Sequence, residues 1–279
     1  MFPKPVFAPV GRVTGPVISQ EIPKNDVFLF DLDALTTNDH GHLDHAFAAY
    51  LLDFAKLRPC YLFGRANYNE VMLRVPSRMR RAFSGVFSES GSELWVQNEV
   101  MIRHEHDFSD DLYEFVAKVI QKSSYSNKLG PMIDCGSACL RICIAGVHSS
   151  IKQTNEYLEW EKEHKELAII IDEFRARFPN HTVYRDTATS LLIMPASFTS
   201  AMVQNHIIKR HKSARIICYL TTRSANGFAG PLCNSFSNGD IVSQVGGPAD
   251  VSQILSYEKR CLTGQEYRIA LHQSRLEEV

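Results

Sequence analysis

The most restrictive feature of the chain is a run of four apolar residues, 27–30, that leads directly into Asp31 and Asp33. An unbroken apolar run of this kind is typical of a strand buried on both faces of a parallel sheet. Asp31 and Asp33 then stand at the carboxyl end of that strand. Because residues two apart on a strand share a face, we expect both carboxylates to point to the same side.

Helix and strand patterns alternate over the first part of the chain. The spacing of apolar residues predicts helices over 45–56 and 67–81, and short apolar runs predict strands at 60–63 and 86–87. Alternation of this kind predicts an α/β fold with a doubly wound parallel sheet.

The pattern changes after residue 95, where an inserted α+β domain is predicted. Its elements are helices over 110–121 and 155–178, a strand over 140–144, and a strand pair formed by 182–184 and 190–194. A helix at 199–209 and a strand at 215–220 then return the chain to the parallel sheet. The predicted units are an N-terminal extension (1–25), a core (26–95 and 191–262), an inserted domain (96–190) and a C-terminal tail (263–279).

Composition narrows the class of protein. The net charge of −1 gives no chain-wide attraction to nucleic acid, and the odd number of cysteines, seven, favours reduced thiols in an intracellular protein. No apolar run approaches the roughly 18 residues that span a bilayer, so no membrane association is expected. The first 20 residues contain no acid, as in mitochondrial targeting segments, but their four prolines would break a targeting helix. Mitochondrial and cytoplasmic locations both stay open.

Two histidine groups contain the residue types of metal ligands. One comprises His40, His42 and His45, and the other comprises His104, Glu105 and His106, which follow a predicted strand. Neither group has further ligands at matching spacing in the sequence. Solvated polar loops are therefore the interpretation that we favour for both.

Four short segments carry a resemblance to a known family in their order and spacing. They are FLFDLDALT at 28–36, GRANY at 64–68, SESG at 88–91 and SLLIMP at 190–195. Over residues 26–240 the chain resembles the eukaryotic phosphomannomutases, a branch of the haloacid-dehalogenase superfamily. The resemblance implies a Rossmann-like haloacid-dehalogenase core, with the inserted segment 96–190 as a cap domain.

The same resemblance implies a chemistry for the aspartates. In that family the first aspartate attacks a sugar phosphate, the second acts as general acid and base, and Mg²⁺ screens the negative charges. Asp31 and Asp33 match these two positions. An active enzyme of this kind would hold Mg²⁺ in part through Asp31.

Most of the family's other functional positions hold different residues here. The positions of a phosphate-binding hydroxyl and a phosphate-binding lysine fall on Ala66 and near Ser200, and the metal-binding loop at 220–230 contains no carboxylate. Among the cap arginines that hold the substrate phosphate, Arg141 alone has a counterpart. These departures predict a degenerate member of the family, without a cofactor.

We therefore interpret Asp31 and Asp33 as a relic catalytic pair that caps the next helix or accepts hydrogen bonds from loop amides. The alternatives are catalysis and a metal site with other ligands. Arg65, after the second strand, also has two interpretations. It binds an anion such as the substrate phosphate, or it takes the place of the metal and pairs with Asp31.

Three functions stay open at this point. We favour a catalytically degenerate, phosphomannomutase-like structural or interaction subunit, for instance in a large ribonucleoprotein such as a mitochondrial ribosome or its assembly intermediate. The others are a Mg²⁺-dependent sugar-phosphate mutase or phosphatase with a rewired site, and a phosphosugar sensor without turnover. The resemblance also implies a homo- or heterodimer through the cap. RNA contact is conceivable through Arg78, Arg80, Arg81, Lys209, Arg210 and Lys212.

Overall fold

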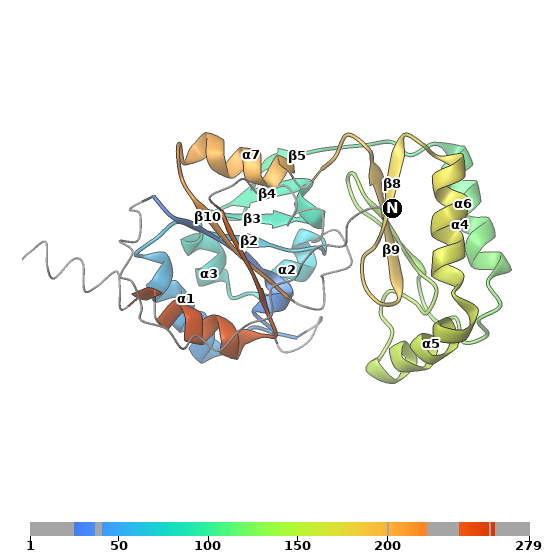
Figure 1. Ribbon diagram of the computed structural model, residues 1–279, viewed down its shortest axis with the longest axis horizontal. Helices are drawn as coiled ribbons and strands as arrows, with labels where there is room; N and C mark the ends of the chain where they lie inside the picture. The colour runs from blue at the N-terminus through green and yellow to red at the C-terminus, as the bar shows by residue number, and fades with distance from the viewer. Residues whose placement is uncertain (1–24, 37–40, 200, 222–239, 257, 260–279) are drawn as a thin grey trace, which may run out of the picture.

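The computed structural model describes residues 25–36, 41–199, 201–221, 240–256 and 258–259 (Figure 1). The predicted N-terminal extension up to residue 24 and the predicted tail at 263–279 lie outside these residues. So do Ser200 and most of the loop at 220–230, on which two of the departures from the family pattern fall.

A seven-stranded sheet in the order β11-β10-β1-β2-β3-β4-β5 forms the core. Its strands are β1 Val27–Asp31, β2 Cys60–Phe63, β3 Gly85–Ser88, β4 Glu93–Val96, β5 Glu99–Arg103, β10 Ile216–Thr221 and β11 Ile241–Val245. The neighbours from β11 to β3 pair in parallel, and β4 and β5 add an antiparallel edge. This parallel-dominated sheet confirms the predicted α/β class.

Strand β1 lies near the middle of the sheet and is buried on both faces, as its apolar run predicted. Phe28 and Phe30 pack into one apolar cluster and Val27 and Leu29 into another, because successive side chains on a strand point to opposite faces. The first cluster contains α1 His45–Ala55, α2 Tyr68–Arg74, α3 Ser77–Ala82 and the helical residues 248–256. The second contains α7 Ala201–Arg210, on the opposite face of the sheet (Figure 1).

A second, four-stranded sheet in the order β6-β7-β9-β8 forms a separate layer (Figure 1). Its strands are β6 Ile133–Cys135, β7 Leu140–Cys143, β8 His181–Arg185 and β9 Ser190–Pro195, all paired antiparallel. One face packs on the helices α4 Asp110–Lys122, α5 Ile151–His164 and α6 Glu166–Arg177. We call these strands and helices the cap.

The other face of the cap sheet packs on the core. Leu192 and Met194 of β9 share an apolar cluster with Phe63, the last residue of β2, with Phe87, the last but one of β3, and with Val203 of α7. The cap and the core are thus joined by buried apolar surface, whose removal from water stabilises their contact.

Two helices that were predicted as continuous are each broken in two. Between α2 and α3 stands Pro76, which lacks an amide hydrogen and forces Val75 into an extended conformation (φ −116°, ψ 126°). Between α5 and α6, Lys165 adopts a left-handed conformation (φ 51°, ψ 33°). There the buried Glu161 carboxylate accepts hydrogen bonds from the amide of Leu167 in the first turn of α6.

Sheet membership also differs from the predicted unit boundaries. Strand β5 falls in the segment 96–190 but pairs with β4 in the core, because Gln97 and Asn98, both with positive φ, turn the chain back as a tight hairpin. Strand β9 lies almost wholly after residue 190 but belongs to the cap, where β8 and β7 flank it. Across the described ranges, no helix is both long and apolar enough to cross a membrane.

Candidate functional site

The predicted aspartate pair lies at the carboxyl end of β1, as expected. Asp31 ends the strand, and Asp33 lies in the single 3₁₀ turn Leu32–Ala34 that follows it; both are buried. One carboxylate oxygen of Asp31 accepts a hydrogen bond from the amide of Asp33 (3.1 Å), and the other accepts one from the amide of Thr221 at the end of β10 (3.2 Å). Asp31 therefore caps the following turn and ties two neighbouring strands together.

Two buried arginines enclose the carboxylate of Asp33. Arg65, in the loop after β2, donates from Nε to Oδ2 (3.1 Å), and its Nη2 contacts the same oxygen. Arg74, at the end of α2, donates from Nη2 to Oδ1 (2.6 Å) and is held in place by the carbonyl of Gly41. Both guanidinium groups are less than a tenth exposed. Charge-assisted contacts of this kind compensate part of the cost of burying a carboxylate.

In one of the two interpretations of Arg65, it takes the place of the metal and pairs with Asp31; the structure corrects the partner to Asp33. Its guanidinium group contacts Asp33, while the two oxygens of Asp31 accept hydrogen bonds from the amides of Asp33 and Thr221. Sequence reasoning missed Arg74 altogether. A signal was present: Arg74 lies three residues after Val71, on the buried face of its helix, where an apolar side chain is the usual choice.

A chain of ion pairs leads from the aspartate pair into the cap. Nη1 of Arg65 donates to the carbonyl of Asp186, just after β8 (2.6 Å), and lies 3.6 Å from the Asp186 carboxylate. Arg141 of β7 donates from Nε to the same carboxylate (2.7 Å). Arg141 also returns a hydrogen bond from Nη2 to the carbonyl of Arg65 (3.0 Å) and pairs with Asp134 on β6 (2.7 Å). We call Asp33, Arg65, Asp186 and Arg141 the ion-pair bridge.

The bridge redefines the role of Arg141, which was a candidate for holding a substrate phosphate. Its guanidinium donors are directed at Asp186, Asp134 and the backbone of Arg65, so they cross from the cap to the core within the protein. A second polar contact runs beside it, because the buried Glu89 accepts hydrogen bonds from the amide and the hydroxyl of Ser137 (both 2.7 Å).

The charges around the aspartate pair and its burial shift the pKa values of the two carboxyl groups in opposite directions. Burial and then the charge of Asp33 raise the pKa of Asp31 to about 7, although the charge of Arg65 opposes this. Burial would also raise the pKa of Asp33, but Arg65 and Arg74 outweigh it and hold that pKa below its ordinary value. Arg141 and Arg65 do the same for the buried Asp186. Asp33 is therefore held in its ionised form, and Asp31 loses its proton at a higher pH than Asp33 does.

The residues around the pair do not fit a Mg²⁺ ion. This ion requires a shell of oxygen ligands, and Asp33 already faces two guanidinium groups. Within the described part of the chain, no three His, Cys, Asp or Glu side chains are grouped so as to hold a metal ion. The loop at 220–230, where the family has an acidic ligand, contains no carboxylate in its sequence.

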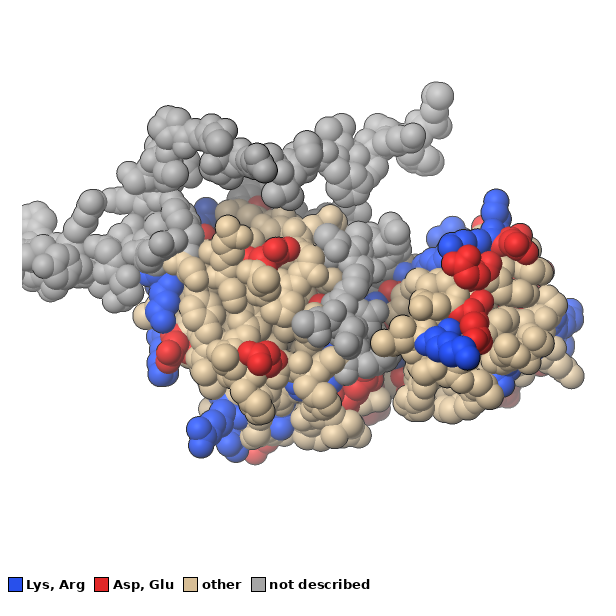
Figure 2. All heavy atoms as spheres, turned by 90° about the horizontal axis from the view of Figure 1, so that it is seen from below, with Lys and Arg blue, Asp and Glu red and all other residues tan. Residues whose placement is uncertain are grey.

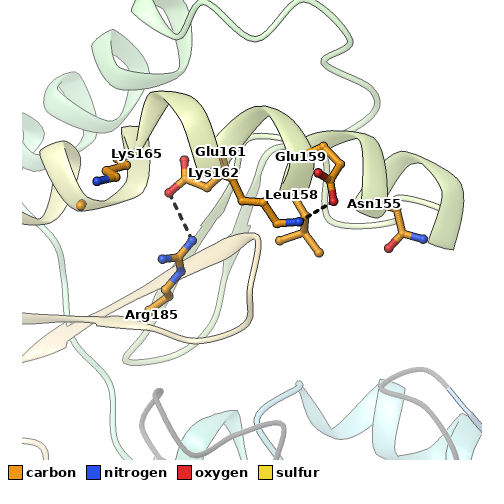
Figure 3. A pocket seen from close by; sticks show the side chains of 8 residues that line it. Asn155, Leu158, Glu159, Glu161, Lys162, Lys165 and Arg185 are labelled. Atoms are coloured by element: carbon orange, nitrogen blue, oxygen red, sulfur yellow. Dashed lines mark hydrogen bonds and ion pairs between the residues drawn. The ribbon is translucent and has the colours of Figure 1, made fainter.

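A hollow of about 470 Å³ opens elsewhere, between α5, α6 and β8. Figure 3 shows Arg185 directed at Glu161, and Lys162 directed at Glu159, along its wall. Most of its charges are thus already in ion pairs within the wall. The hollow contains neither Asp31 nor Asp33 and is not part of the site described above.

The basic residues predicted to contact RNA divide into two groups on opposite faces of the core sheet, one on α3 and one at the end of α7 (Figure 1). Arg80 is buried and donates to the side chain of Asn98 (2.7 Å) and the carbonyl of Val75 (3.2 Å), which corrects its assignment as an RNA contact. The others are exposed: Arg78, Arg81, Lys209, Arg210 and Lys212. Figure 2 shows basic and acidic side chains lying intermixed on the cap, at the right of that view.

Comparison with known proteins supports the fold. No family model matches the chain, and no curated protein matches it. Among solved structures, an IMP-nucleotidase from Plasmodium falciparum, N-terminally truncated and with IMP bound, superposes with a TM-score of 0.54 at 13% identity, covering 85% of this chain and 67% of that one.

Two further structures extend the likeness. A haloacid dehalogenase-like hydrolase from Bacteroides thetaiotaomicron has a TM-score of 0.53 at 15% identity, covering 83% of this chain and 100% of that one. The trehalose-6-phosphate phosphatase of Aspergillus fumigatus has a TM-score of 0.51 at 12% identity, covering 86% and 93%. At these identities the comparison establishes the fold alone. The chain has the Rossmann-like fold of haloacid-dehalogenase hydrolases, and the narrower resemblance to phosphomannomutases stays a prediction.

The ion-pair bridge predicts that changes at Arg65 and Asp33 affect the free energy of unfolding non-additively. Removing one partner of a buried ion pair typically costs about 3–5 kcal/mol, because the other charge is left uncompensated. We expect Arg65→Gln to lower the free energy of unfolding by this order, and Asp33→Asn with Arg65→Gln to cost less than the sum of the two single changes. Urea denaturation measures both.

The matched control for this cycle is Lys118→Gln, which removes an exposed ion pair with Glu114 on α4. Pairs of this kind contribute about 0–1 kcal/mol. An Arg65→Gln variant that loses no more stability than Lys118→Gln would show that the bridge does not hold the fold together.

The raised pKa of Asp31 makes stability depend on pH. A carboxyl group whose pKa rises from 3.8 to about 7 on folding favours the folded state fully below the lower value. That contribution is lost as the pH rises towards 7, at about 1.4 kcal/mol per pH unit. We expect Asp31→Asn, which does not ionise, to gain stability relative to the wild type between pH 5 and pH 8. A difference between the two proteins that stays constant with pH would contradict this.

Proposed function

We propose that this chain is a non-catalytic, phosphomannomutase-like protein in which the former catalytic residue Asp33 now helps to fix the cap on the core, and that it serves as an interaction subunit. Its overall fold is similar to that of hydrolases such as the IMP-nucleotidase and the trehalose-6-phosphate phosphatase named above. The observation that carries the proposal is the position of Asp33 within the ion-pair bridge.

A general acid and base must exchange a proton during the reaction, and its pKa is best placed near the working pH. The charges of Arg65 and Arg74 move the pKa of Asp33 in the opposite direction, below its ordinary value. To protonate a leaving group, Asp33 would have to give up contacts with two buried guanidinium groups. This geometry supports a structural role for Asp33.

The environment of Asp31 supports the same conclusion. A nucleophilic carboxylate must be ionised, and burial and the neighbouring Asp33 raise the pKa of Asp31 to about 7. Ala66 stands where the family has a phosphate-binding hydroxyl. Loss of one such donor typically costs about 10²–10³ in rate, and loss of an acid or base costs about 10²–10⁴. These losses do not add simply, but each acts against turnover.

A rigid fold with a closed site suits a protein that presents surfaces to partners. We further propose that the chain is a subunit of a ribonucleoprotein particle, such as a mitochondrial ribosome or its assembly intermediate. The exposed cations on α3 and at the end of α7 support contact with phosphate groups. Dimerisation through the cap, which the resemblance implied, is part of the same proposal.

The non-catalytic claim predicts the outcome of a phosphatase assay. With p-nitrophenyl phosphate and Mg²⁺, we expect the wild type and Asp31→Asn to release phosphate at the same background rate. Mg²⁺-dependent release that disappears in Asp31→Asn would establish an active enzyme. Thermal stabilisation by a hexose phosphate without turnover would instead establish a phosphosugar sensor.

The interaction claim predicts the behaviour of the chain in gentle purification. We expect the tagged chain to elute in stoichiometric amount with a large RNA-containing particle, and Lys209→Glu combined with Lys212→Glu to weaken this association at moderate salt. Lys152→Glu is the control, since Lys152 is 87% exposed on α5, far along the chain from these cations. Elution as a free chain under all gentle conditions would refute the claim.

A further inference from the structure

Two histidines meet beside the crossovers between the core and the cap. His106 lies in the segment that leads from β5 into the cap, and His181 begins β8. Their Nε2 atoms are 3.1 Å apart and share a hydrogen bond, in which one ring donates and the other accepts. In the sequence His106 had no second ligand at matching spacing, because its neighbour in space lies 75 residues further along the chain.

The position of His181 connects it to the second crossover. It pairs across the cap sheet with Pro195, the last residue of β9, and the amide of Ala196 donates to the carbonyl of Asn180 (2.9 Å). From there the chain returns to the core through α7. Both crossovers therefore pass the same pair of imidazoles.

The surroundings hold the two imidazoles in place while leaving them partly exposed. The amide of His106 donates to the carbonyl of Ser137 (2.8 Å), and both rings contact Phe108. Phe178 packs against His181 from another side. Fixed rings with access to solvent are what an incoming ion requires.

The separation of the two nitrogens matches the coordination geometry of one metal ion. Zn²⁺ binds imidazole nitrogen at about 2.0–2.1 Å, so two nitrogens of a tetrahedral site lie about 3.3 Å apart. The observed 3.1 Å needs only a small adjustment. Late first-row dications prefer imidazole nitrogen over the oxygen donors that Mg²⁺ requires.

We propose that His106 and His181 form a binding site for a divalent transition-metal ion such as Zn²⁺, which ties the two crossovers together. The ion replaces the hydrogen bond between the two Nε2 atoms. The imidazole that carried its proton on Nε2 shifts to the tautomer with the proton on Nδ1, so that both rings ligate in their neutral form, and water fills the remaining positions. Among the described residues, no third His, Cys, Asp or Glu completes the group.

The site does not depend on the proposed function, since neither Asp31 nor Asp33 belongs to it.

Calorimetric titration of the full chain with Zn²⁺ tests the proposal. We expect one ion per chain, with the affinity lowered at least about tenfold by His106→Gln and by His181→Gln. Glutamine retains a hydrogen bond to the remaining imidazole, so the melting temperature without Zn²⁺ should stay close to that of the wild type. Substitution with Co²⁺ should give the visible absorption of a site with nitrogen ligands, and both variants should lose it.

The matched control is His104→Gln, two residues away, where the imidazole lies against Phe198 instead of His181. We expect this variant, and Asp31→Asn, to bind Zn²⁺ as the wild type does. The proposal is overturned if Zn²⁺ does not bind, or if both His106→Gln and His181→Gln bind it unchanged. It is also overturned if Cys135→Ser, at the exposed thiol of β6, is the change that removes binding.

Discussion

The enclosure of the buried Asp33 carboxylate by two guanidinium groups is the interaction on which the rest of the arrangement depends. A buried anion is tolerated only when opposite charge and hydrogen bonds compensate its lost hydration. Arg74 supplies part of this from the core, and Arg65 supplies part while also reaching the backbone of Asp186 in the cap. The guanidinium group of Arg65 therefore both balances the charge of Asp33 and holds the cap in position.

Apolar packing and the ion-pair bridge contribute differently to the contact between the core and the cap. The cluster that joins Leu192 and Met194 to Phe63 and Phe87 removes apolar surface from water. This burial stabilises the contact but does not by itself fix the orientation of the cap. The bridge fixes the orientation of the cap, because the guanidinium group of Arg141 fits only where Asp186, Asp134 and the carbonyl of Arg65 converge. Together they explain how the cap is held in a defined position on the core beside Asp33.

Local patterns allowed much of the fold to be predicted and little of the bridge. The apolar run of β1 and the alternation that follows it depend on neighbouring residues, so the parallel core and the place of Asp31 and Asp33 were accessible. Arg65 was predicted to face the aspartate pair, but its partner Asp33 was not predicted. Asp31 instead accepts a hydrogen bond from the amide of Thr221, which lies 190 residues further along the chain. Asp186, 121 residues from Arg65, and His181 beside His106 have partners that only the folded chain brings together.

Carbon-13 NMR titration of the aspartate carboxyl groups, assigned through Asp31→Asn and Asp33→Asn, tests the central claim most directly. The claim is that Asp33 is a permanent anion held by Arg65 and Arg74. It predicts that the signal of Asp33 stays at its ionised position well below the ordinary pKa of an aspartate, while Asp31 titrates near pH 7. A signal of Asp33 that titrates at or above the ordinary value would show a carboxyl group still able to act as a general acid, and would contradict the account.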